Sequence, residues 1–176
     1  MYALYLPNKY YKNGQELFPI PYVDLSYKKI HFFYRYNFDL LNTASINLGY
    51  DLFKNKQETI LITPSIGWMY NQANGPIGGF QLSVKYKKWQ LYGINQFLYA
   101  LNDTKLINWY TWSEINYKVH ALFRPGASIF ARHFTETNTL YFDLGTVFIS
   151  ELNKFSFSIY LMNPWNEKFY SFIGVS

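Results

Sequence analysis

The sequence contains no cysteine, so it has neither a disulfide framework nor a thiolate metal site. Charged residues are only 15% of the chain, whereas a soluble domain carries about 25%. No apolar run reaches the length of a membrane-spanning helix. The N-terminus also lacks the basic segment and apolar core of a signal peptide, so we expect either a cytosolic protein or an exported one whose signal was removed.

The sequence is rich in aromatic residues, which make up 22% of its 176 positions. Its 18 Tyr, 16 Phe and 5 Trp favour strands, and this abundance of apolar surface excludes disorder and argues against a helical bundle. The net charge of +5 is modest and its lysines are scattered, so we expect no nucleic-acid partner. The length fits one domain, residues 1–176.

Turn-forming residues recur at short intervals and divide the chain into twelve segments. Tight, lysine-containing breaks alternate with longer breaks rich in Asn, Asp, Thr, Gly or Pro. The tight breaks lie near positions 28, 55, 87, 118 and 153, and the longer ones near 13, 42, 75, 103, 136 and 165. Short turns at one end and longer loops at the other are typical of outer-membrane barrels. We predict an all-β fold, a closed antiparallel up-and-down transmembrane barrel of about twelve strands. Ten strands is the alternative, because 2–11 and 168–176 are the weakest segments.

Apolar and polar residues alternate between the breaks. In segment 80–86, for example, Phe80 and Leu82 share one face and Gln81 lies on the other. The polar face is rich in small residues, which suit a narrow lumen, whereas a solvated exterior would carry many long charged side chains. We therefore predict a polar lumen and a lipid-facing apolar exterior. The alternative is a soluble lipocalin-like barrel that hides its apolar face and binds a hydrophobic ligand.

Eight charged residues fall on the predicted polar face, four acidic and four basic. They are Asp24, Arg35, Asp51, Lys85, Glu114, Arg124, Arg132 and Asp143. Unpaired charges in a narrow lumen are costly, so this balance predicts cross-lumen ion pairs or hydrogen-bonded networks. Such networks would either stiffen the barrel or line a small pore of weak ion selectivity.

The first thirty residues resemble the start of the MipA/OmpV-type outer-membrane barrels. The resembling residues are Tyr5-Leu6-Pro7, Tyr10, Asn13-Gly14, the stretch 18–24 with its two prolines, Tyr27 and the aromatic strand from Ile30. The match covers about a fifth of the chain. It implies the outer membrane of a Gram-negative-type bacterium and a scaffold-like or transport-associated role. It brings no catalytic signature.

Histidine-based chemistry is a further possibility that the sequence raises. His133-Phe134-Thr135 with Glu136 resembles the His-x-Ser motif of lipid A deacylases, but Val147 stands where that pattern places its carboxylate. A membrane-embedded lipid esterase is therefore a third hypothesis, and our expectation is that the protein is not an enzyme. The histidine spacing predicts no metal site, and we expect no cofactor.

Two local features complete the predictions from sequence. Residues 124–126, Arg-Pro-Gly, predict a bulge or bend in their strand. Residues 74–79 contain three glycines and predict a flexible loop that could contact a partner protein. We expect membrane lipid as one partner, and a protein bound through the loops or the rim as another.

Overall fold

The computed structural model describes residues 2–6, 16–36, 42–54, 60–102, 108–135, 138–153, 155–167 and 169–175. The predicted breaks near 13, 55, 103 and 136 lie outside these residues. The described chain is all β, with no helix. Accordingly, none of the described residues forms a helix of the length and hydropathy that crossing a membrane requires.

Fourteen strands are present in the described part of the chain. They are β1 (Tyr2–Leu6), β2 (Glu16–Ile20), β3 (Tyr22–Tyr27), β4 (Ile30–Tyr36), β5 (Thr43–Tyr50), β6 (Phe53–Lys54), β7 (Ile60–Asn71), β8 (Gly75–Tyr86), β9 (Trp89–Leu98), β10 (Asn108–Tyr117), β11 (Phe123–Phe134), β12 (Thr139–Leu152), β13 (Phe155–Met162) and β14 (Tyr170–Val175).

The strands form one antiparallel up-and-down sheet, as the turn pattern predicts. The hydrogen-bonded order is β2-β1-β14-β13-β12-β11-β10-β9-β8-β7-β5-β4-β3, and β6 pairs with β7 beside β5. The two ends of this order, β2 and β3, do not pair with each other, so the sheet formed by the described residues is not closed, which differs from the predicted closed barrel. They are instead consecutive in the chain and separated only by Pro21, whose carbonyl accepts a hydrogen bond from the Tyr36 amide (3.1 Å).

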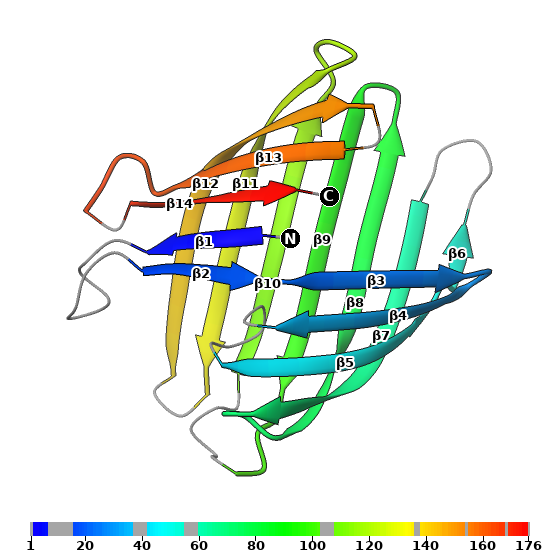
Figure 1. Cartoon of the computed structure of the whole chain (residues 1–176), viewed down its shortest axis with the longest axis vertical. Coiled ribbons are helices and arrows are strands. Elements are labelled where there is room, and N and C mark those ends of the chain that lie inside the picture. Colours follow the sequence, from blue (N-terminus) through cyan, green and yellow to red (C-terminus); the bar gives the residue numbers. More distant parts are fainter. Residues whose placement is uncertain are drawn as a thin grey trace.

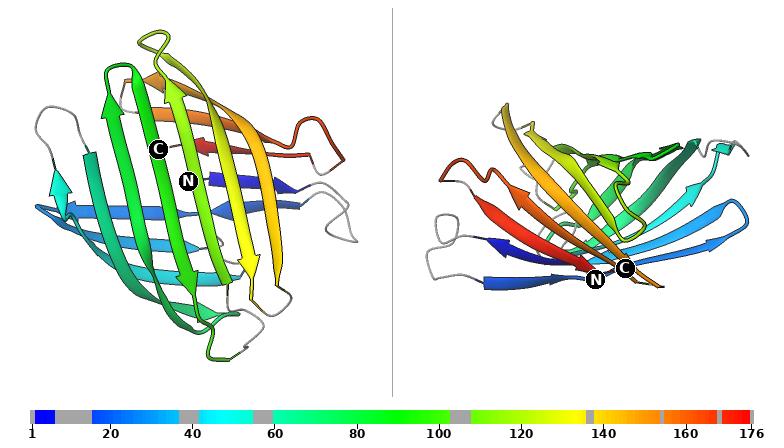
Figure 2. Two further views of the ribbon diagram at one scale, coloured as in Figure 1. Left: turned by 180° about the vertical axis from the view of Figure 1, so that it is seen from behind. Right: turned by 90° about the horizontal axis from the view of Figure 1, so that it is seen from above.

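The sheet folds back on itself, so that one of its faces becomes an interior. In Figure 1, β1–β5, β13 and β14 lie across the long strands β8–β11, and Figure 2 shows those long strands from the other side. Contacts between strands that are distant in the order confirm that the layers face each other. Arg35 on β4 reaches Gln96 on β9, and the ring of Trp112 on β10 lies 5.4 Å from that of Phe172 on β14.

At the lysine-containing breaks near 28 and 87 the structure has the predicted tight turns, whereas the break near 118 is a longer connection, residues 118–122, between β10 and β11. Tyr27 pairs with Ile30 around Lys28-Lys29, and Tyr86 pairs with Trp89 around Lys87-Lys88. The first residue of each turn is left-handed, with φ of 57° at Lys28 and 51° at Lys87. Two-residue hairpin loops need such a conformation because it matches the twist of the flanking strands.

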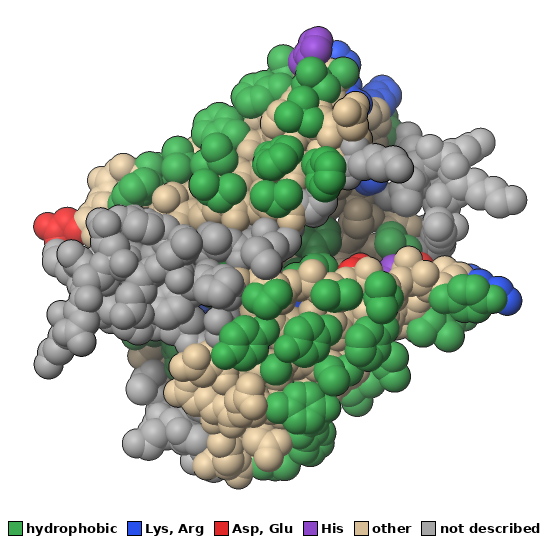
Figure 3. All heavy atoms as spheres, viewed as in Figure 1, with side chains coloured by type: hydrophobic (Ala, Val, Ile, Leu, Met, Phe, Trp, Pro, Cys, Tyr) green, Lys and Arg blue, Asp and Glu red, His purple; other side chains and the backbone are tan. Residues whose placement is uncertain are grey.

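The two faces of the sheet follow the predicted alternation. Large apolar side chains on the outer face are exposed, including Leu25 (61%), Ile66 (71%) and Phe155 (60%). Polar side chains on the inner face are buried, including Arg35 (0%) and Gln96 (2%). Apolar side chains spread over the strands in Figure 3, whereas the lysines and arginines in view gather near the ends of the molecule.

Two local predictions are wrong. The supposed flexible loop at 74–79 is mostly the start of β8, and its turn is fixed because the Asn74 amide donates to Asn102 Oδ1 (2.8 Å). Segment 124–126 contains no bulge, since β11 pairs with β12 in unbroken register through Pro125 and Gly126. Gly126 has a packing role instead: a Cβ there would collide with the carbonyl oxygen of Ile115 on β10.

Candidate functional site

The interior face of the sheet gathers most of the charged residues singled out from the sequence, and it is the candidate site. Asp24 and Arg35 come from β3 and β4, Glu114 from β10, Arg124 and Arg132 from β11, and Asp143 from β12; Asp51 follows β5, and Lys85 lies exposed near the end of β8. Each of the four acids has a hydrogen-bond or ion-pair partner outside this set of eight. The interior is therefore organised by neutral side chains and a histidine as much as by the predicted acid–base pairing.

The histidine cluster, which we define as Asp24, His31, Asp51 and Thr63, lies between β3 and β7. His31 Nδ1 is 3.3 Å from Asp24 Oδ1 and His31 Nε2 is 2.9 Å from Asp51 Oδ1. The Thr63 hydroxyl donates to the same Asp51 oxygen at 2.7 Å. Both imidazole nitrogens can donate only in the imidazolium form, so this geometry fits a cation held between two carboxylates. It ties three strands and the residue after β5 together on the inner face.

A second interior contact joins the two layers of the sheet. The Arg35 guanidinium donates to Gln96 Oε1 at 2.6 Å, and the Tyr110 hydroxyl donates to the same oxygen. Arg35 is fully buried and its guanidinium carbon lies 5.6 Å and 5.4 Å from the ring centroids of Tyr22 and Phe33. A neutral amide thus accepts from the most deeply buried charge in the described chain, and aromatic faces add cation–π stabilisation.

The remaining charged groups are also held by specific partners. Arg124 forms an ion pair with Glu151 and donates to Gln90 Oε1. Glu114 accepts from the Tyr160 hydroxyl at 2.8 Å. Asp143 accepts from the Asn163 side-chain amide at 2.5 Å and from the Tyr170 hydroxyl at 3.1 Å.

Arg132 lies among aromatic rings on the inner face. Its guanidinium carbon is 5.9 Å from the ring centroid of Tyr110, 5.4 Å from that of Phe130 and 5.7 Å from that of Phe134. The Arg132 guanidinium therefore lies against the faces of aromatic rings. Together with the ion pair of Arg124, they leave little reason to expect a ring of like charges of the kind that selects ions in a channel.

Part of the interior is apolar, which the sequence analysis did not anticipate. The apolar cluster consists of Met69, Ala73, Ile77, Ile94, Leu98, Ala100 and Tyr110, with Tyr92, Trp112 and Phe130 packed against it. Beside it, the ring of Tyr160 stacks on that of Phe172 at 4.3 Å. Large side chains therefore fill the space between the two layers in this region.

Several interior polar atoms have no hydrogen-bond partner among the residues that the structure describes. They include Asn47 Oδ1, Gln81 Nε2 and Asn116 Oδ1. Buried polar groups are almost always satisfied, so these positions are where we expect interior water.

Sequence reasoning missed the partners of the charged residues. The alternation pattern places Gln90, Gln96 and Tyr160 on the inner face, as it does their partners. It does not indicate which residues meet across the interior. Glu151, which is close to the break predicted near 153, lies within β12. Periodicity carried through to residue 152 could have placed it on the inner face.

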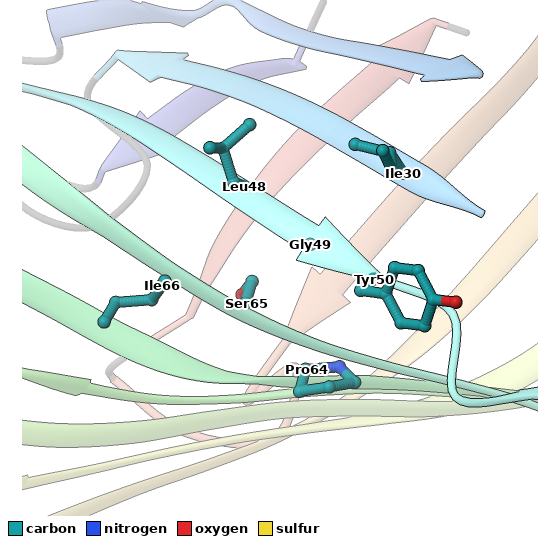
Figure 4. Close-up of a pocket in the computed structure, with 7 residues that line it drawn as sticks. All are labelled: Ile30, Leu48, Gly49, Tyr50, Pro64, Ser65 and Ile66. Atoms are coloured by element: carbon teal, nitrogen blue, oxygen red, sulfur yellow. The ribbon is translucent and has the colours of Figure 1, made fainter. Parts of the chain in front are cut away.

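A separate pocket lies on the outer face of the sheet. It is lined by Ile30 of β4, by Leu48, Gly49 and Tyr50 of β5, and by Pro64, Ser65 and Ile66 of β7. Figure 4 shows these side chains around a common space, with Leu48, Ile30 and Tyr50 on one side and Pro64 and Ile66 on the other. The pocket offers no nucleophile–base pair, so we treat it as a binding surface.

The described residues offer no group of three or more His, Asp or Glu side chains that could hold a metal ion. His133 of the esterase hypothesis lies 3.1 Å, through Nε2, from Asn138 Oδ1, and Glu136 lies outside the described residues. Comparison with known proteins brings no further guide, because no family model, curated protein or solved structure matches the chain.

Proposed function

We propose that this protein is an outer-membrane β-barrel whose filled interior makes it a rigid scaffold for partner proteins. The proposal rests on the distribution of side chains over the two faces of the sheet, which is the reverse of that in a soluble protein. Side chains such as Leu25, Ile66 and Phe155 are well exposed, whereas Arg35 and Gln96 are buried. Monomeric soluble proteins rarely expose apolar patches beyond a few hundred square ångströms, so a continuous apolar exterior points to lipid as its solvent.

The proposal includes closure of the sheet in the membrane. Lipid provides no hydrogen-bond partners, so an open strand edge cannot persist in the hydrocarbon region. The chain offers a way to close, because residues 16–27 pair with β1 through β2 and with β4 through β3. Counting β2 with β3 and β5 with β6 as single crossings, the proposed barrel has twelve strands.

The filled interior favours a scaffold over an open channel. The apolar cluster and the stacked rings of Tyr160 and Phe172 occupy space that a channel would need. A narrow pore is the second candidate, and its support is the set of interior polar atoms that we expect to be hydrated. A soluble carrier of a hydrophobic ligand has less support, since a buried arginine and glutamine occupy the interior that such a ligand would need to enter.

Location and conduction are tested separately. The full chain is refolded into neutral detergent and run on gels with and without heating, because a closed barrel migrates differently when it is not boiled. We expect a heat-dependent shift, a need for detergent and insertion into phospholipid vesicles. A protein that stays monomeric and folded in buffer alone would refute the membrane assignment.

Conductance then distinguishes the scaffold from the pore. In planar bilayers we expect no discrete current steps from the inserted wild-type protein. A Trp112→Ala variant, which removes a large interior ring, serves as the matched positive control for detecting an opened lumen. Regular steps from the wild type would favour the pore, and the resemblance to MipA/OmpV-type barrels remains part of the proposal in either case.

A further inference from the structure

The outer pocket exists because the ladder beside it is interrupted. The β5–β7 pairing ends at Gly49 and Ser65, and pairing resumes at Phe53 and Ile62. Three residues, 50–52, thus lie opposite two, 63–64, on the other strand, which is a β-bulge. Pro64 lies in this interval and has no amide hydrogen to donate to the ladder. The bulge leaves a groove on the outer face, between the side chains of Leu48 and Tyr50 and those of Pro64 and Ile66.

Two lysines lie at the end of this groove. Lys28 and Lys29 form the tight turn that leads into Ile30, which itself lines the pocket. The Lys29 ammonium lies 5.9 Å from the ring centroid of Tyr50, another lining residue, and the Lys28 ammonium lies 5.3 Å from that of Tyr27. Tyrosines with lysines above them are typical of the level where hydrocarbon meets headgroups.

The chain contains a matched hairpin without the bulge. The turn Lys87-Lys88 also follows a tyrosine, and its ammonium groups lie 5.1 Å from the ring centroid of Tyr86 and 6.0 Å from that of Tyr117. Its ladder is unbroken from Tyr86–Trp89 to Ile77–Leu98. The two turns therefore carry the same pair of lysines in similar local geometry, and an apolar groove lies beneath one of them.

We propose that the groove between β5 and β7 binds one acyl chain of an anionic phospholipid whose phosphate is held by Lys28 and Lys29. This inference rests on the proposed membrane location. The groove supplies apolar contact for the chain, and two cations supply a complement to one phosphate. Each lysine near a membrane surface contributes roughly a fivefold gain in affinity for anionic lipid, so the pair gives a selectivity of about twenty-five-fold.

The test measures lipid binding to the detergent-solubilised full chain by native mass spectrometry. Dioleoylphosphatidylglycerol is compared with dioleoylphosphatidylcholine, which has the same acyl chains and no net charge. We expect the wild type to bind the anionic lipid about twenty-five-fold more tightly. The variant K28Q/K29Q should lose this preference, the matched control K87Q/K88Q should keep it within twofold, and K28R/K29R should retain it.

A variant that fills the groove tests whether the groove binds an acyl chain. Ile66→Trp places a ring in the groove and should weaken binding of both lipids, whereas glycerol 1-phosphate, a headgroup without a chain, should compete poorly. Equal losses in the two glutamine variants, or full competition by glycerol 1-phosphate, would show that only rim charge matters and overturn the site. A gel shift on heating checks that each variant is folded. If the wild type needs no detergent and enters no vesicle, the proposed function fails first and takes the lipid site with it.

Discussion

The apolar cluster and the histidine cluster occupy the same inner face, but different interactions hold their side chains in place. The apolar cluster, centred on Leu98 and Tyr110, excludes water by close packing. The histidine cluster is held by directional contacts, and its outermost member, Asp24, has a side chain that is 37% exposed. The comparison suggests that stability is concentrated in β7–β10, while β3 and β4 contribute less.

The largest effect is expected in the apolar cluster. Leu98 is fully buried, and Leu98→Ala should lower the free energy of unfolding by about 3 kcal/mol, because it leaves a cavity as well as removing apolar contact. Urea titrations in detergent, followed by tryptophan fluorescence, measure the change. Leu140→Ala on the outer face, where the side chain is 60% exposed, is the matched control and should cost far less. Equal losses would mean that the interior is not packed as described.

The strands around the apolar cluster also show which features can be predicted from the sequence. Alternation assigned Phe80 and Gln81 to opposite faces, and the lysine turns at 28 and 87 were located correctly, because both depend on neighbours in the chain. The sequence could not indicate that Leu98 and Ile77 fill the interior. Their parity places them on the polar face, and only the folding over of the sheet brings them together.

A smaller effect is expected at the contact that joins the layers. Gln96→Leu removes the acceptor shared by the Arg35 guanidinium and the Tyr110 hydroxyl, and should cost about 2 kcal/mol because a hydrogen bond to a buried charge is lost. The same urea titration applies. Gln96→Glu restores an acceptor and should recover part of the loss. If Gln96→Leu proves neutral, Arg35 is satisfied by its other surroundings.

The partnership of Arg35 and Gln96 illustrates the limit of prediction from one sequence. Arg35 was identified as inward-facing, but its acceptor is 61 residues further along the chain. The eight charges predicted ion pairs or hydrogen-bonded networks but not their partners, which for Asp51 and Glu114 are Thr63, His31 and Tyr160. Distances across the interior depend on the tilt and stagger of the strands, and neither quantity produces a periodic pattern in the sequence.

Within the histidine cluster, the effect should be smaller again. Asp51→Asn keeps an oxygen that can accept from Thr63 but removes the negative charge 2.9 Å from His31 Nε2. We expect a loss of about 1 kcal/mol, the ordinary worth of one hydrogen bond. A double-mutant cycle with His31→Gln isolates the pair, and a coupling near zero would show that His31 and Asp51 act independently.

Asp24→Asn should have the smallest effect and gives the sharpest test of the comparison. Asp24 faces His31 Nδ1 at 3.3 Å from a strand that ends the hydrogen-bonded order, with its carboxylate partly exposed. Water screens such a contact where the sheet is open, so the expected loss in an open sheet is no more than about 0.5 kcal/mol. The result depends on the environment of β3. If closure of the barrel shields Asp24 from water, the substitution should cost as much as Asp51→Asn does, in detergent and in vesicles alike. Equal, small losses in both solvents would place β3 at a water-accessible edge and count against closure through residues 16–27.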